Sequence, residues 1–141
     1  MKKLKKEDLY KLYKRCLNLV KRKPAEFFLF KRMSKYAGSC NWTDIELDHR
    51  CDLLSTAYHE CVHYIEPKWC ETQVLYTESR LRNSLAYLDH ARFLKHLSSK
   101  LYKSELQRHI LSLPKKRRKN QNRTINRTKV PWILSIQDDN Y

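Results

Sequence analysis

The sequence predicts an α+β protein that is mostly helical, with a short edge sheet packed on one central helix. Apolar residues recur at helical spacing over most of the first 113 residues. Residues 42–48 instead alternate polar and apolar side chains, which is typical of a strand. Gly38 is the only glycine among 141 residues, so Gly-rich phosphate loops are excluded and tight-hairpin folds are disfavoured. Hydrophobic residues make up 41% of the chain, which favours a folded domain.

Three elements are expected before residue 50. Asp8 is placed to cap a first helix that ends before Pro24, and its apolar residues follow at i, i+3, i+4 spacing: Leu9, Leu12, Tyr13, Cys16, Leu17 and Val20. The apolar segment 25–37 is predicted as a second short helix. In residues 42–48 the acidic side chains alternate with Ile45 and Leu47, which predicts an edge strand.

Helices are expected from there to residue 113. One spans residues 52–66 and ends at Pro67. Residues 71–88 and 91–110 are both helical in pattern, but their apolar stripes lie on different faces of an ideal helix. This slip predicts a break at Asp89 and His90, with Asp89 capping the second piece. We therefore expect a core over residues 1–113, with strand and central helix at about 40–66 and a further helix at about 89–103. Residues 114–141 form a basic tail.

The charge of the chain favours a polyanionic partner. Thirty Lys and Arg against 15 Asp and Glu give a net charge of +15, and a surplus of that size is typical of nucleic-acid binding. The densest run would neutralise phosphates without reading sequence: Lys115, Lys116, Arg117, Arg118 and Lys119. A solvated lysine-rich surface or a localisation signal are the alternatives.

The cysteines and the hydropathy predict an intracellular protein without a membrane segment. Five cysteines, an odd number at irregular spacing, do not form a disulfide framework. The first residues are charged throughout and lack the apolar run of a signal peptide. No stretch approaches the roughly 18 apolar residues that a membrane helix needs.

The central helix carries the order His-Glu-x-x-His, formed by His59, Glu60 and His63. The two histidines lie one turn apart, opposite the apolar stripe, so they face a cleft or solvent. Imidazoles at i and i+4 converge on one metal ion, and Glu60 is placed to act as general base. One alternative is coincidence, since the motif arises by chance in about one such chain in a hundred. The other is that both histidines are ordinary core or surface residues.

A catalytic zinc ion needs a third protein ligand. The downstream candidates are Glu71, Glu78, Asp89 and His90. The break predicted at Asp89 and His90 favours that pair, because a helix start can direct a side chain back towards the site. Cys61 lies on the apolar side and is expected in the core.

Residues 38–103 resemble the SprT/Spartan-like zinc metallopeptidases. Ile45 and Leu47 match the I-x-L strand of that family, which precedes the helix with the histidine motif. His90 and Phe93 match the His-x-x-Phe/Trp setting of its third ligand. The resemblance implies a zincin-like core and one Zn²⁺ ion held by the three imidazoles of His59, His63 and His90.

The same resemblance implies that Glu60 is the general base and that the substrate is a protein. The Spartan branch cleaves proteins crosslinked to DNA, which suggests a DNA-associated substrate.

The chain departs from the pattern of this family in two respects. The interval between His63 and His90 is longer than is usual in the family, which leaves Glu78 as an alternative third ligand. No cysteine follows Cys70, so the zinc ribbon that often follows the protease core is missing.

Two other functions are compatible with these residues. The chain could be a basic nucleic-acid-binding protein in which the histidine motif is coincidental. Alternatively, it could bind zinc as a regulatory or interaction protein without protease activity.

Overall fold

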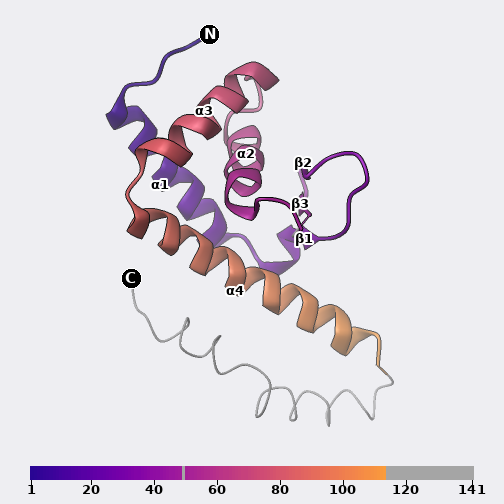
Figure 1. Cartoon of the computed structure of the whole chain (residues 1–141). Helices are drawn as coiled ribbons and strands as arrows, with labels where there is room; N and C mark the ends of the chain where they lie inside the picture. Colours follow the sequence, from indigo (N-terminus) through magenta and orange to yellow (C-terminus); the bar gives the residue numbers. More distant parts are fainter. Residues whose placement is uncertain (49, 114–141) are drawn as a thin grey trace.

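The structure is a computed structural model that describes residues 1–48 and 50–113. Figure 1 shows a helical molecule with a small sheet at one end, which confirms the predicted α+β class. In chain order the elements are α1 (Lys6–Arg22), the 3-10 turn η1 (Ala25–Phe27), β1 (Phe28–Phe30), β2 (Gly38–Cys40), β3 (Ile45–Leu47), α2 (Leu53–Ile65), α3 (Glu71–Ser84) and α4 (Tyr87–Leu111). The predicted basic tail lies outside the described residues.

Helix α1 forms where the periodicity predicted it, but Asp8 does not cap it. The helix begins at Lys6, after Lys5, and no side chain caps its start. Asp8 lies in the first turn, where a carboxylate interacts favourably with the positive end of the helix dipole. The predicted apolar face is buried, and its centre is the fully buried Tyr13.

The sheet corrects two predictions. Residues 25–37 do not form a second helix, because Phe28 and Phe30 point into the core from strand β1. Strand β3 is the central strand of the order β1-β3-β2 and not an edge strand. It pairs parallel with β1 and antiparallel with β2. Strand β2, which the sequence did not predict, forms the edge beside α2.

Helix α2 begins and ends as predicted. The Asp52 side chain caps it by accepting a hydrogen bond from the Ser55 amide, and Pro67 follows its end. Its apolar side packs on the sheet and on α1, where Tyr58, Ala57 and Val62 are buried. Burying a large apolar side chain of this kind contributes roughly 1.5–3 kcal/mol, so this side fixes the orientation of the helix.

Helices α3 and α4 are separate, as predicted, but the break lies earlier than expected. Helix α3 ends at Ser84, and α4 begins at Tyr87 after Ala86. Asp89 is therefore in the first turn of α4 and not its cap. Helix α4 packs along α1 and covers β1 and η1 (Figure 1). None of the described helices combines the length and apolar character needed to cross a membrane.

Candidate metal centre

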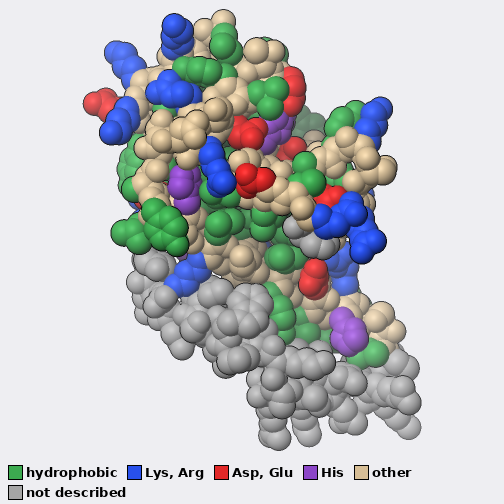
Figure 2. Space-filling view, viewed as in Figure 1, with side chains coloured by type: hydrophobic (Ala, Val, Ile, Leu, Met, Phe, Trp, Pro, Cys, Tyr) green, Lys and Arg blue, Asp and Glu red, His purple; other side chains and the backbone are tan. Residues whose placement is uncertain are grey.

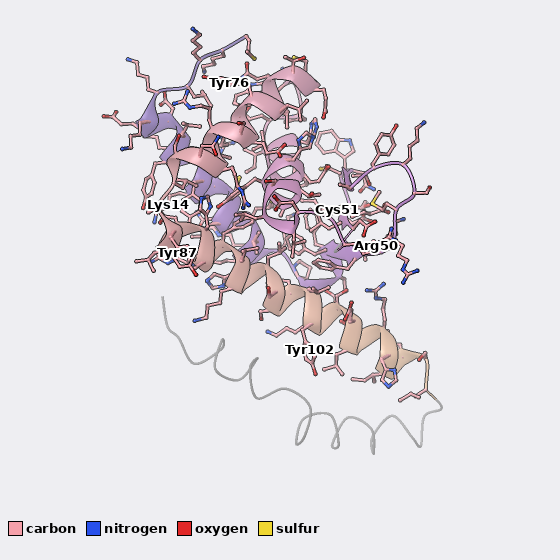
Figure 3. All side chains as sticks on the ribbon, viewed as in Figure 1. Lys14, Arg50, Cys51, Tyr76, Tyr87 and Tyr102 are labelled. Atoms are coloured by element: carbon pink, nitrogen blue, oxygen red, sulfur yellow. The ribbon has the colours of Figure 1, made fainter. Side chains whose placement is uncertain are left out.

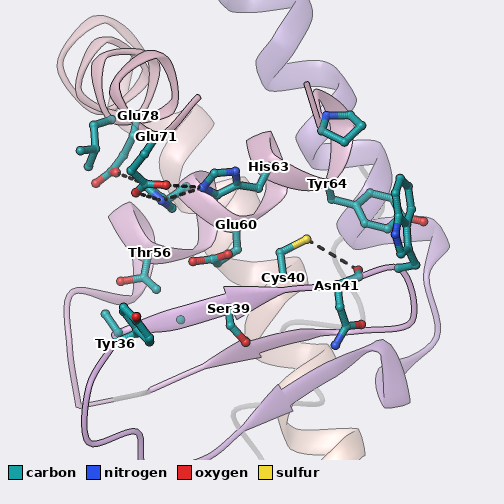
Figure 4. A pocket seen from close by; sticks show the side chains of 16 residues that line it. Tyr36, Ser39, Cys40, Asn41, Thr56, Glu60, His63, Tyr64, Glu71 and Glu78 are labelled. Carbon is teal, nitrogen blue, oxygen red and sulfur yellow. Dashed lines mark hydrogen bonds and ion pairs between the residues drawn. The ribbon is translucent and has the colours of Figure 1, made fainter. Parts of the chain in front are cut away.

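The polar side of α2 faces an open cleft of about 690 Å³. Its walls are α2, α3 and the segment around β2, and His59, Glu60 and His63 all line it (Figure 4). The side chains of His59 and His63 are 14% and 26% exposed, so both rings are partly shielded from water. The helical phase predicted that the two histidines face a cleft or solvent, and the structure places them in a cleft.

Glu71 connects the two imidazoles. One carboxylate oxygen lies 2.9 Å from Nε2 of His59, and the other lies 2.8 Å from Nε2 of His63. The two Nε2 atoms are themselves 3.1 Å apart. These three residues are a group whose donor atoms could hold one metal ion. Glu71, one of the four downstream candidates, is therefore the residue that the structure brings to the histidine pair.

Glu78 contacts the other nitrogen of the same ring. Its Oε2 atom lies 2.7 Å from Nδ1 of His59. A carboxylate can only accept here, so Nδ1 carries a proton and the neutral ring has its lone pair on Nε2. This contact raises the pKa of His59, and burial partly opposes the shift. Carboxylates in this position orient metal-binding histidines and increase their basicity.

Antiparallel packing of α3 on α2 accounts for these contacts. Along α3, Glu71 lies beside His63 and His59, Glu78 beside His59, and Arg82 beside Asp52 at the start of α2. Glu71 and Glu78 are seven residues apart and share one face of α3, next to its buried face of Val74, Thr77 and Leu81. That i, i+7 spacing is the sequence signal that could have selected Glu71 and Glu78 together.

The donor set fits a zinc ion. If His59 is neutral, its Nε2 lone pair faces both a carboxylate oxygen and a second imidazole nitrogen, an arrangement that needs a positive charge at the centre. A proton or a metal ion would supply it. In a tetrahedral zinc site with bonds of about 2.0–2.1 Å, neighbouring ligand atoms are about 3.3 Å apart. The two Nε2 atoms are 3.1 Å apart, close to that spacing, and with one Glu71 oxygen they lie within 4.8 Å of one another.

Glu60 is buried between α2 and β2, with 6% of its surface exposed. The pKa of its carboxyl is raised to about 7, mainly by burial; His59 opposes this rise, and the Glu71 and Glu78 carboxylates add to it. Gly38 makes this position possible. A Cβ atom on Gly38 would lie 3.0 Å from Cγ of Glu60 and 2.8 Å from Cγ2 of Thr56. The only glycine of the chain therefore lets β2 pass directly against the helix beside Glu60.

His90 does not join this group, which corrects the prediction that it is the third ligand. Its Nε2 lies 3.1 Å from the carbonyl oxygen of Arg82, and its Nδ1 lies 2.9 Å from the hydroxyl of Tyr58. The carbonyl only accepts, so Nε2 is protonated and Nδ1 accepts from Tyr58. Both ring nitrogens are engaged on the apolar side of α2. Asp89 is also on this side, where its carbonyl accepts a bond from Tyr13.

The basic residues predicted to bind nucleic acid and the cysteines complete the list of predicted positions. Lys115, Lys116, Arg117, Arg118 and Lys119 lie outside the described residues, so their role in binding nucleic acid stays a prediction. Cys61 is buried in the core, as expected. In the described part of the chain all five cysteines are free thiols.

Comparison with known proteins gives no relative: no family model, no curated protein and no solved structure matches this chain.

Proposed function

We propose that the chain is a zinc-dependent peptidase whose metal is held by His59, His63 and Glu71. The convergence of these three side chains beside Glu60, a buried carboxylate in the same cleft, carries the proposal. A zinc ion bound there would polarise the scissile carbonyl and favour ionisation of a nearby water.

Glu60, Glu78 and strand β2 would have separate roles in the reaction. Glu60 would accept a proton from the attacking water and deliver it to the leaving amine, and it lines the same cleft as the proposed metal ligands. Glu78 holds His59 in the tautomer that directs Nε2 at the metal. Among the described strands, β2 pairs with β3 alone, and an extended peptide would add to its other edge.

The charge of the chain supports a nucleic-acid-associated protein as the substrate. Acidic side chains gather with histidines on the face shown in Figure 2, whereas Lys and Arg side chains lie around it. With a net charge of +15, the rest of the molecule would be attracted to a polyanion. A non-enzymatic nucleic-acid-binding protein or a zinc-binding regulator remain the alternative functions.

Metal analysis combined with a cleavage assay tests the proposal. Purified wild type should hold one zinc ion per chain, and the His59→Ala and His63→Ala variants should lose it. The matched control is His109→Ala, which removes an exposed histidine near the end of α4 and should keep the metal. Glu60→Gln should also keep the metal but fail to cleave an unfolded protein.

Two results would contradict the proposal. Wild-type protein that binds no zinc would exclude the metal centre. Cleavage by Glu60→Gln at the wild-type rate would show that Glu60 is not the base.

A further inference from the structure

Exposed apolar side chains gather at the cleft. Among the described residues eight large hydrophobic side chains are exposed, and three of them line this one cleft: Tyr36, Trp42 and Leu75. Trp42 is 77% exposed, the largest fraction of the three. Isolated exposed apolar residues are ordinary, but several around one concave site indicate a binding surface.

Trp42 is presented on a turn that its neighbour holds rigid. The Oδ1 atom of Asn41 accepts hydrogen bonds from the Thr43 amide, the Thr43 hydroxyl and the Asp44 amide, each 2.8 Å long. The Asn41 amide group donates to a carboxylate oxygen of Asp44 at 3.1 Å. This network fixes the backbone on both sides of Trp42. The indole is therefore displayed at the cleft without the large entropy cost of ordering a loose loop.

Tyr64, which also lines the cleft, is held in place by its neighbours. Tyr64 packs edge-on against Phe27 with ring centroids 5.2 Å apart, and the Lys23 ammonium lies 5.3 Å from the centre of its ring. Pro67 also lines the cleft. In Figure 4, Tyr64 and Asn41 lie at one end of the cleft, Tyr36 and Thr56 at the other, and Glu60 and His63 between them.

We propose that Trp42, Tyr64 and Pro67 form a subsite for one large apolar side chain, aromatic or long aliphatic, of an extended polypeptide substrate. The inference rests on the proposed function, because it takes Glu60 and His63 as the reacting end of the same cleft. Two aromatic rings and a proline line the cleft and offer apolar surface to a flat or branched hydrocarbon group.

The charge of the cleft favours a polypeptide over a nucleobase as the occupant. Stacking on aromatic rings would also suit an unpaired base. However, the cleft is lined by the carboxylates of Glu60, Glu71 and Glu78, and a nucleotide would bring its phosphate towards them. A peptide main chain carries no such charge.

Peptide binding to a zinc-loaded Glu60→Gln variant tests the subsite without turnover. The probes are short labelled Gly-Ser peptides with a single Phe moved along the sequence, followed by fluorescence anisotropy. Phe at one position should tighten binding by about tenfold or more over Ala at that position, as expected for filling an apolar pocket. Leu should behave like Phe.

Variants assign the preference to Trp42. Trp42→Ala, added to Glu60→Gln, should abolish the preference for Phe while zinc content stays unchanged, and Trp42→Phe should retain most of it. The matched control is Tyr87→Ala. Tyr87 is 82% exposed at the start of α4, away from Arg50 and the sheet in Figure 3, and it does not line the cleft.

The outcomes separate this inference from the proposed function. Equal binding of all peptides, no binding of any, or a preference that survives Trp42→Ala would overturn the subsite. Tighter binding of a single-stranded oligonucleotide than of any peptide, lost in Trp42→Ala, would also overturn it and assign the rings to bases. If the Phe preference is found but wild type cleaves none of the peptides, the subsite stands and the hydrolysis fails.

Discussion

The two sides of helix α2 place histidines in different surroundings. On the open side His59 and His63 face the cleft and carboxylates from α3. On the closed side Tyr58 meets His90 from α4. The two sides contain the same residue type, and neighbours decide its chemistry. On the open side a carboxylate fixes the proton on Nδ1 of His59 and leaves Nε2 directed at the cleft. On the closed side both nitrogens of His90 are engaged by neutral groups.

This difference shows which histidines are able to bind a metal ion. A histidine ligand needs a ring nitrogen that faces the metal position, and a nearby negative charge favours binding of the cation. Both conditions hold on the open side, where Glu71 and Glu78 contact the rings. Neither holds for His90, whose Nδ1 lone pair accepts the Tyr58 hydroxyl and whose Nε2 faces a backbone carbonyl.

The largest expected effect is a loss of zinc affinity when the carboxylates on the open side of α2 are changed. Glu71→Gln should weaken zinc affinity by more than about 100-fold, because it removes a charged ligand. Glu78→Gln should weaken it by about 10–100-fold, the range found for residues that orient a ligand. His90→Gln should leave the affinity within about twofold of wild type. Competition with a chelating dye measures all three.

The reverse order would contradict this assignment. A His90→Gln variant that loses zinc, with Glu71→Gln unaffected, would restore His90 as the third ligand. A Glu78→Gln effect larger than that of Glu71→Gln would exchange the roles of the two carboxylates.

The sequence predicted the open side better than the closed side. The i, i+4 spacing of His59 and His63 and the amphipathic phase of α2 predicted that both rings face a cleft or solvent, because these features depend on one helix alone. The third ligand depends on how α3 packs against α2, which the periodicity does not contain. The break in phase was real, but its position after Ser84 and not at Asp89 placed His90 against Tyr58.

The sheet was hard to predict for a similar reason. Phe28 and Phe30 form a short apolar run that fits a buried strand or a helix, and length alone does not separate the two. Whether Ile45 and Leu47 lie in an edge or a central strand depends on that assignment, since β1 is the parallel neighbour that makes β3 central. From the sequence, the single glycine indicates only which Gly-rich motifs are excluded, whereas in the structure it permits the contact of β2 with α2.

Gly38→Ala should give the second largest effect, a loss of stability that arises on the open side of α2 alone. The new Cβ would lie 2.8 Å from Cγ2 of Thr56 and 3.0 Å from the backbone oxygen of Glu46, so β2 must move away from α2. Overpacking of this kind costs about 1–3 kcal/mol. Urea unfolding should show the loss, and peptide cleavage should fall with it.

Adding Thr56→Ser to Gly38→Ala provides the control for this prediction. It removes the closest of the three contacts and should recover part of the stability, but the contact with the Glu46 backbone remains. A Gly38→Ala protein as stable as wild type would show that β2 does not approach α2 closely.

Tyr58→Phe should affect the closed side alone. It removes the hydroxyl that His90 accepts and leaves the ring packing on Phe93, whose centroid is 4.5 Å away. The loss should be about 1 kcal/mol, or about 3–6 °C in melting temperature, with zinc content unchanged. Calorimetry and metal analysis on the same sample measure both. A loss of zinc in this variant would mean that the two sides of α2 are not independent.

The smallest expected effect is a change in how stability depends on alkaline pH. Tyr13, buried in α1, donates from its hydroxyl to the Asp89 carbonyl 2.7 Å away and so attaches the start of α4. Burial raises the pKa of Tyr13 to about 12, above the value of about 10 of an unfolded tyrosine. Its contribution to stability is therefore complete below about pH 10 and is lost as pH rises through about 12.

Melting temperatures of wild type and Tyr13→Phe between about pH 9 and 12 test this dependence. Tyr13→Phe should be less stable than wild type near pH 9, because it lacks the hydrogen bond. The difference should shrink as pH rises, since the unfolded wild type then gains by ionising and the variant cannot. Tyr10→Phe is the matched control, because Tyr10 is 42% exposed one turn earlier in α1. Parallel curves for wild type and Tyr13→Phe would show that the closed side does not depend on a buried, protonated phenol.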